Sequence, residues 1–175
     1  MPKIILGLGS NVGDRAANLQ TAIGGIKGFV EGVQLSAVLE SAALLPEGAP
    51  KEWDVSFLNM AVMAECRLAP AQLLTQVKQL ETTIGRVKHG HWSPREIDID
   101  ILAYGEEVHI LNNLQIPHPY LLERDFALLP FAELWPEWKN PAEGEYQGWF
   151  ARDIAADKNF GFSDALKLAE VVLHG

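Results

Sequence analysis

Two aspartates alternate with isoleucines in the segment Ile97-Asp98-Ile99-Asp100-Ile101. A period of two predicts a β-strand with one buried face, so both carboxylates would project from the opposite face. They would lie roughly 7 Å apart and repel each other. A divalent cation would relieve that repulsion, and Mg²⁺ is usually held by one or two carboxylates plus substrate phosphates. A wet strand face that carries aspartates is also common, so the pair alone leaves a metal role open.

Cationic groups gather just before this strand: Arg86, Lys88, His89, His91 and Arg95, the last within Trp92-Ser93-Pro94-Arg95. The chain as a whole is acidic, with a formal net charge of −9 from 23 acidic and 14 basic residues. The cluster is therefore a local exception. Paired carboxylates beside it favour a site for Mg²⁺ and a polyphosphate.

Composition excludes several classes of protein. The net charge argues against non-specific binding to nucleic acid or to an anionic membrane surface. Cys66 is the only cysteine, which excludes a disulfide framework and a cysteine-based zinc site. The N-terminus lacks the pattern of a signal sequence, and no apolar run reaches the length of a membrane span. We expect one domain over 1–175, in the reducing cytoplasm.

The elements that must position the aspartates follow from apolar spacing. The pattern predicts strands at 3–8, 33–40, 57–67 and 97–103, a helix at 70–84, and a helix that follows Asp14 and whose C-terminal end is weakened by Gly24, Gly25 and Gly28. Asp14 is placed to cap the first helix, and Pro70 and Gly85 to open and close the second. The order strand–helix–strand–strand–helix–strand indicates an α+β, ferredoxin-like βαββαβ fold with an antiparallel sheet and both helices on one face. Further helices are expected at 126–134 and at 164–173, the latter capped by Ser163.

Other polar groups have two interpretations each. Gly7-Leu8-Gly9-Ser10-Asn11 lies between a strand and a helix, but it lacks the third glycine of a dinucleotide motif, and a tight turn explains it. Phe57 and Asn59 share a strand face and could hold a flat heterocycle, or could belong to the core. Lys78 and Glu81 could form an ordinary surface pair.

His118 lies between two prolines and is followed by Arg124 and Phe126. A lone histidine is more often structural. In this restrained backbone, with an arginine close behind, it is a candidate for contact with phosphate.

Together these motifs resemble the 6-hydroxymethyl-7,8-dihydropterin pyrophosphokinase family. They are G-L-G-S-N-x-G-D-R, F-L-N, E-x-x-x-G-R, W-x-P-R-x-I-D-I-D-I-L, P-H-P and R-x-F, in the family's order over about 3–136. The resemblance implies transfer of pyrophosphate from ATP to the pterin's hydroxymethyl group, with release of AMP, in folate biosynthesis.

The resemblance also implies roles for individual residues. Asp98 and Asp100 would hold two Mg²⁺ ions, and Asp98 would border the pterin. Phe57, Asn59 and Phe126 would form the pterin pocket. Catalysis would involve Arg86 and Arg95 as well as the aspartates. ATP would be bound by Lys78, Glu81, Arg86, Lys88, Trp92, Arg95, His118 and Arg124.

Some segments depart from the family pattern. Lys88 replaces a frequent arginine, Lys78 a neutral amide and Ser93 a glycine, and the usual Y-x-T-x-P-x-G segment is replaced by Leu39 to Gly48. Residues 137–175 lie outside the motifs as a C-terminal, helical extension without assigned chemistry. Contact with other folate-pathway enzymes is left open, as are oligomeric state and kinetic order.

Two rival functions use the same residues. A metal-dependent phosphohydrolase would use water as acceptor and release phosphate without pterin. A non-catalytic pterin or nucleotide sensor would bind ligand without turnover, with the C-terminal segment as its contact surface.

Overall fold

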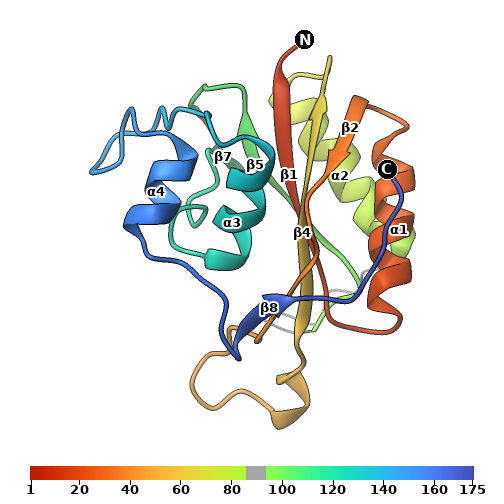
Figure 1. The fold of residues 1–175 in the computed structure, drawn as a ribbon. Coiled ribbons are helices and arrows are strands. Elements are labelled where there is room, and N and C mark those ends of the chain that lie inside the picture. Colours follow the sequence, from red (N-terminus) through yellow and green to blue (C-terminus); the bar gives the residue numbers. More distant parts are fainter. Residues whose placement is uncertain (86–93) are drawn as a thin grey trace.

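A six-stranded antiparallel sheet lies between two layers of helices in the computed structural model, which describes residues 1–85 and 94–175 (Figure 1). The first half of the chain supplies β1 (Lys3–Ser10), α1 (Arg15–Ile26), β2 (Glu31–Leu35), β3 (Leu39–Ser41), β4 (Phe57–Glu65), α2 (Pro70–Ile84) and β5 (Asp98–Tyr104). A short 3-10 helix, η1 (Lys51–Trp53), interrupts the loop before β4. The second half supplies β6 (His109–Leu111), β7 (Leu114–Ile116), α3 (Asp125–Leu134), α4 (Ala151–Asp157) and β8 (Leu166–Leu168).

The order of strands, β5-β1-β4-β3-β8 with β2 also on β4, confirms the α+β ferredoxin-like prediction. Helices α1 and α2 cover one face of the sheet, and α3 and α4 lie on the other (Figure 1). We call these the α1/α2 face and the α3 face. Among the described residues, no helix is long and apolar enough to cross a membrane.

Three helix ends form where the sequence predicts them, and α1 ends at Ile26, just after Gly24 and Gly25. The Asp14 carboxylate accepts the backbone N–H of Ala17 at 3.0 Å and caps α1. Pro70 occupies the first turn of α2, where its missing N–H costs no hydrogen bond. Gly85 ends that helix at φ 103°, a left-handed conformation that favours glycine.

The strand predicted at 33–40 is broken at Ser36 into β2 and β3. The N–H of Ser36 donates to the Ala61 carbonyl at 3.1 Å, while the Ser36 hydroxyl accepts the Ala61 N–H at 2.8 Å. A side-chain oxygen thus replaces a backbone carbonyl in the ladder, and regular pairing resumes only at Leu39.

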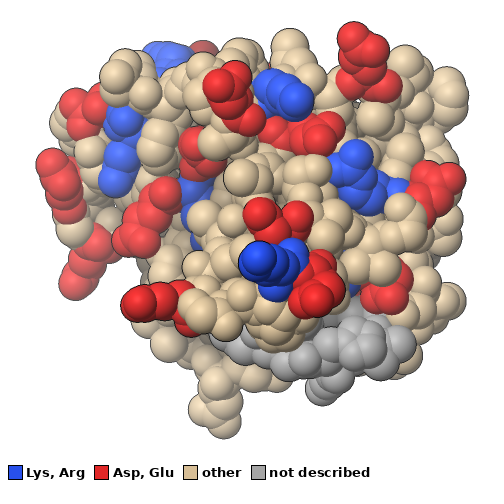
Figure 2. Space-filling model, turned by 90° about the horizontal axis from the view of Figure 1, so that it is seen from below, with Lys and Arg blue, Asp and Glu red and all other residues tan. Residues whose placement is uncertain are grey.

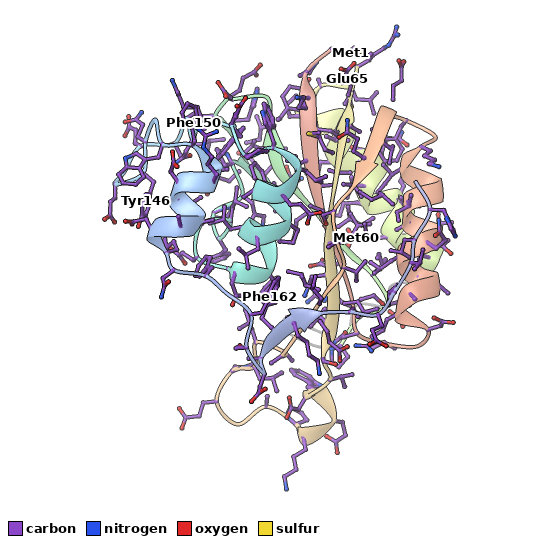
Figure 3. The ribbon with its side chains drawn as sticks, in the orientation of Figure 1. Met1, Met60, Glu65, Tyr146, Phe150 and Phe162 are labelled. Atoms are coloured by element: carbon purple, nitrogen blue, oxygen red, sulfur yellow. The ribbon has the colours of Figure 1, made fainter. Side chains whose placement is uncertain are left out.

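Each face of the sheet has its own apolar core. On the α1/α2 face the fully buried residues include Ile4, Leu6, Leu19, Ile23, Leu73, Val77 and Ile99. On the α3 face they include Ile5, Leu128, Phe131, Trp138 and Ile154. Met60 lies midway along β4, and Tyr146 and Phe150 lie with α4, on the side of α3 away from the sheet (Figure 3). Residues 137–161 therefore extend the second layer.

The helix predicted at 164–173 is wrong. Residues 166–168 form β8, which pairs with β3, and the chain beyond is extended. Ser163 accepts the Ala165 N–H at 3.2 Å and shapes a turn instead of capping a helix. Ala169, Val171 and Leu173 pack on the α1/α2 core with the period of an extended chain. Pairing β8 with β3 covers backbone groups that an edge strand would leave exposed.

Candidate active site

The α3 face changes character along the strands. Near the start of β1 it is apolar and covered by α3, but toward the end of β1 glycine replaces the large side chains. Strand register pairs Gly7 with Asp100, and Gly9 with both Asp98 and Asn59. Paired residues in antiparallel strands point to the same side, so Gly9 forms a floor between Asp98 and Asn59, while the Leu102 side chain occupies the space over Gly7.

A side chain at Gly9 would fill this floor. A Cβ atom there would lie 2.8 Å from Oδ1 of Asn59 and 3.4 Å from Cδ1 of Phe57. Phe57 and Asn59 thus border the space above Gly9, as their shared strand face predicts. Asn59 is buried, and its Nδ2 donates to the Ser41 hydroxyl on β3 at 2.5 Å.

Asp98 and Asp100 lie half-buried on this face, while Ile99 and Ile101 are buried on the other, which confirms the predicted strand. Burial, and then the Asp98 charge, raise the pKa of Asp100 to about 7, against the opposing charges of Lys78 and Arg124. Asp98 also pairs with Arg95, whose Nη1 is 3.1 Å from its Oδ1. The two carboxylates are therefore crowded, and a cation would relieve the crowding.

Glu81 approaches the aspartates from the opposite side of β5. It is 2% exposed, and its Oε1 lies 2.8 Å from Nζ of Lys78. Its Oε2 accepts the N–H of Ile99, the residue between the aspartates, at 3.4 Å. The surface-pair interpretation is therefore wrong, because this pair links α2 to the strand that carries the carboxylates.

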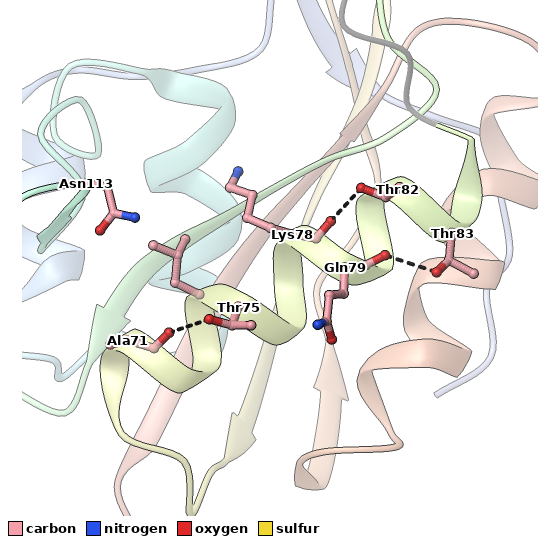
Figure 4. A pocket seen from close by; sticks show the side chains of 8 residues that line it. Ala71, Thr75, Lys78, Gln79, Thr82, Thr83 and Asn113 are labelled. Carbon is pink, nitrogen blue, oxygen red and sulfur yellow. Dashed lines mark hydrogen bonds between the residues drawn. The ribbon is translucent and has the colours of Figure 1, made fainter.

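A wide groove of about 960 Å³ runs along the outer side of α2 toward the β6–β7 turn (Figure 4). Lys78 points toward the side where Asn113 lies, while Thr83 faces away from it (Figure 4). The hydroxyls of Thr75, Thr82 and Thr83 donate to carbonyls one helical turn back. The groove is lined by Ala71, Leu74, Thr75, Lys78, Gln79, Thr82, Thr83 and Asn113.

His118 is held in one orientation beside Asp100. Its backbone N–H donates to the Leu102 carbonyl at 3.0 Å, and its Nδ1 accepts the Tyr120 N–H at 3.2 Å. Burial, then the nearby Arg124, lowers the pKa of His118 to about 4, so the ring is neutral at pH 7. With Nδ1 accepting, the hydrogen lies on Nε2, which is 3.9 Å from Oδ1 of Asp100. The ring offers this edge as a donor.

Arg124 precedes α3 and is positioned by aromatic rings. Its guanidinium carbon lies 4.5 Å from the ring centre of Tyr120 and 5.9 Å from that of Phe126. Within the described residues, Phe126 and Phe57 make no ring contact with each other. The structure thus gathers Arg95, Asp98, Asp100, His118 and Arg124 at one end of the α3 face, with Phe57 and Asn59 across the glycine floor.

Comparison with known proteins decides the family. Residues 5–136 match the model of 7,8-dihydro-6-hydroxymethylpterin-pyrophosphokinase (HPPK). A 2-amino-4-hydroxy-6-hydroxymethyldihydropteridine pyrophosphokinase of Aquifex aeolicus is 41% identical over 141 residues, which are 81% of this chain and 85% of that protein. The chain belongs to the HPPK family. The resemblance inferred from the sequence is confirmed.

Some HPPK relatives are much longer than this chain. A folate synthesis bifunctional protein of Chlamydia caviae is 45% identical over 135 residues, which are 76% of this chain but 30% of that protein. A crystal structure of Plasmodium falciparum HPPK-DHPS with pterin and p-hydrobenzoate superposes with a TM-score of 0.70 at 15% identity, over 95% of this chain and 47% of that one. The chain spans about a third to a half of these relatives, and the crystal structure supports the fold alone.

Sequence reasoning missed one positioning residue of this HPPK chain. Asn11 accepts the Arg95 N–H at 2.8 Å through Oδ1, and its own N–H donates to the Arg95 carbonyl at 3.1 Å. Its Nδ2 donates to the carbonyl of Val55 at 3.2 Å. Asn11 therefore joins the loops before β4 and β5. Its burial at 3% was the missing signal, since the motif alone is explained by a turn.

Arg86, Lys88 and Trp92, like His89 and His91, lie outside the described residues. Acidic and basic side chains are interspersed over the face seen in Figure 2.

Proposed function

We propose that this chain transfers a pyrophosphoryl group from ATP to the hydroxymethyl oxygen of 6-hydroxymethyl-7,8-dihydropterin in folate biosynthesis. The new bond joins that oxygen to the β-phosphorus, the bond from the β-phosphorus to the α,β-bridging oxygen breaks, AMP leaves and the hydroxyl proton is released. The observation that carries the proposal is the glycine floor, which connects two crowded carboxylates to a buried carboxamide and an aromatic ring.

The donor set fits Mg²⁺. Asp98 and Asp100 would hold two ions through oxygen atoms, with phosphate oxygens and water completing each shell. The described residues contain no group of three or more His, Cys, Asp or Glu side chains placed to hold a metal ion. When bound, Mg²⁺ would neutralise phosphate charge and lower the pKa of the attacking hydroxyl. Arg95, paired with Asp98, would contact the transferring phosphates.

ATP would lie between the groove on α2 and the aspartates. Lys78 and Glu81 connect these two places, because Lys78 lines the groove and pairs with Glu81, whose Oε2 accepts the N–H of Ile99 on β5. His118 would donate its Nε2 hydrogen to a phosphate, and Arg124 would add charge. Arg86, Lys88 and Trp92 are proposed as further ATP contacts on the resemblance alone, with Arg86 also in catalysis.

The pterin would occupy the space above Gly9. Asn59 would hydrogen-bond the ring, and Phe57 and Phe126 would stack on it. Asp98, paired with Gly9 in the sheet, would border the hydroxymethyl group.

We place the whole of residues 1–175 in one pyrophosphokinase domain, with a family-like core over about 3–136. We also propose a cytoplasmic location. The bifunctional relatives favour other folate enzymes as partners, since the matched region is there part of a longer chain.

The test is nucleotide product analysis after incubation with ATP, Mg²⁺ and the pterin. AMP that appears only when both pterin and Mg²⁺ are present supports the proposal. ADP and phosphate without pterin would favour the hydrolase, and ATP binding without turnover would favour the sensor.

A further inference from the structure

Ser41 forms a buried hydrogen bond with the carboxamide that borders the glycine floor. The hydroxyl of Ser41 accepts from Nδ2 of Asn59 at 2.5 Å, and the two side chains are 4% and 8% exposed. An Nδ2 group has two hydrogens. The bond to Ser41 uses one of them, so one N–H and Oδ1 remain for another partner.

The hydrogen bond to Ser41 fixes the orientation of the Asn59 carboxamide. Oδ1 lies over Gly9, where a Cβ atom would come within 2.8 Å of it. Within the described residues, no protein donor hydrogen-bonds to Oδ1. This oxygen still has some access to solvent, because it is absent from the fully buried side-chain atoms that lack a hydrogen-bond partner. The acceptor Oδ1 therefore borders the space above Gly9, and the second N–H of the same carboxamide has no partner among the described residues.

The C-terminal segment holds Ser41 in place. Strand β8 pairs with the whole of β3, with Ser41 opposite the buried Leu166. The next residue, Ala42, donates its N–H to the Ala165 carbonyl at 2.9 Å. Without β8 the three residues of β3 would be a free edge, so the segment outside the family match supports the position of Ser41.

We propose that Ser41 is a positioning residue that fixes the Asn59 carboxamide so that its acceptor and remaining donor meet a matching edge of the pterin ring. This rests on the proposed function for the identity of the ring. Ser41 does not touch the reacting atoms, and its effect is confined to recognition of the ring.

The experiment measures the equilibrium Kd of the pterin, together with KM and kcat, in variants of the full chain. In Ser41→Ala the pterin Kd and KM rise roughly 3- to 10-fold, as expected for the loss of one hydrogen bond, while kcat and the KM of ATP stay within about twofold. Ser41→Thr keeps the hydroxyl and restores pterin binding. Ser41→Cys fills the space with a weak acceptor and behaves like Ser41→Ala.

Ser36 provides a matched control. It is also a buried serine whose hydroxyl accepts an N–H from β4, but it lies at the break between β2 and β3. Ser36→Ala lowers the melting temperature and leaves the pterin Kd unchanged. If Ser36→Ala and Ser41→Ala weakened pterin binding equally, the loss would come from a loosened sheet, and the proposal would be overturned.

A double-mutant cycle separates action through Asn59 from any other route. In an Asn59→Ala background, adding Ser41→Ala changes the pterin Kd by less than about twofold. An undiminished effect in that background would contradict the proposal, as would an unchanged Kd in Ser41→Ala alone.

The outcomes also separate this inference from the proposed function. If the chain binds the pterin but forms no AMP, the function fails, and the Kd comparison still decides the role of Ser41. If AMP forms normally and the pterin KM of Ser41→Ala is unchanged, only the inference fails. A chain that neither binds the pterin nor forms AMP would overturn both.

Discussion

The two ends of the α3 face are built by the same strands and differ in what covers them. At one end Ile5, Met63 and Leu102 lie under α3, which contributes Phe131, and the surface is apolar. At the other end Gly7 and Gly9 replace large residues, and the neighbouring strands present carboxylates and a carboxamide. The first end stabilises the sheet. The second uses that rigid sheet to position groups that would be costly to bury without a ligand.

The largest effect is expected from the carboxylates at the polar end. Asp98→Ala or Asp100→Ala should lower turnover by about 10³-fold or more, because metal-assisted charge neutralisation is lost. Unfolding should remain cooperative, since neither side chain holds the core. Steady-state kinetics with Mg²⁺ and circular dichroism check this, and addition of EDTA to the unaltered chain should give the same loss. A near-normal rate in either variant would remove the metal assignment.

A substitution at the apolar end should lower stability and leave substrate binding unchanged. Phe131→Ala deletes a fully buried ring that packs on Trp138 at 4.9 Å between ring centres. The free energy of unfolding should fall by about 3–5 kcal/mol. Urea denaturation measures it, and the folded fraction should keep its pterin KM. A large rise in that KM without loss of stability would mean that the two ends are not separate.

Gly9→Ala tests the floor itself. The added methyl would lie within 2.8 Å of the Asn59 oxygen and displace the carboxamide. We expect the pterin Kd to rise roughly tenfold, as for a lost hydrogen bond with steric conflict, and the KM of ATP to change little. Gly24→Ala is the control, because Gly24 lies in α1 and a methyl group there would meet no neighbouring element within 4 Å. Equal effects of the two substitutions on pterin binding would contradict the proposal that the pterin lies above Gly9.

Asn11→Ala tests the connection between the loops. It removes hydrogen bonds to the backbones of Arg95 and Val55. We expect kcat to fall roughly 5- to 50-fold because Arg95 loses its fixed position. Asn18→Ala, which removes a carboxamide bonded to Ser10 and Val12, is the matched control and should change kcat much less. Single-turnover rates would show whether chemistry or release is slowed.

The smallest effect is a pH-dependent one on stability. Because the pKa of Asp100 is raised to about 7 in the folded chain, the folded state holds a proton that the unfolded state loses near pH 4. Stability from this group is thus present at low pH and falls as pH rises toward 7. In metal-free buffer, Asp100→Asn should melt above the unaltered chain at pH 8 and show no such advantage at pH 4. The melting temperatures of both proteins between pH 4 and pH 8 test this prediction. A difference in melting temperature that does not change with pH would contradict it.

Local patterns predicted much of this molecule because their causes are local. The alternation around Asp98 and Asp100, the cap at Asp14, Pro70 and the left-handed Gly85 each depend on a few neighbouring residues. The ferredoxin-like order follows from those elements. The HPPK motifs identified the family for the same reason, since each is a short run of particular side chains.

The remaining features depended on residues that are far apart in the chain. A helix over 164–173 satisfies the local pattern, but pairing of β8 with an exposed β3 edge covers backbone groups that a helix would leave uncovered. Asn11 contacts Arg95 across 84 positions, and the Ser41–Asn59 bond spans 18. The low pKa of His118 comes from burial beside Arg124.

By itself, then, the sequence determined the elements of the βαββαβ core, their order and the residue types of the candidate site, because apolar period, capping and motif spacing are short-range properties. Only the tertiary structure decided which side chains lie within hydrogen-bonding distance and which are removed from water. Those contacts and that burial set the direction of the Asn59 carboxamide and the charge states of Asp100 and His118.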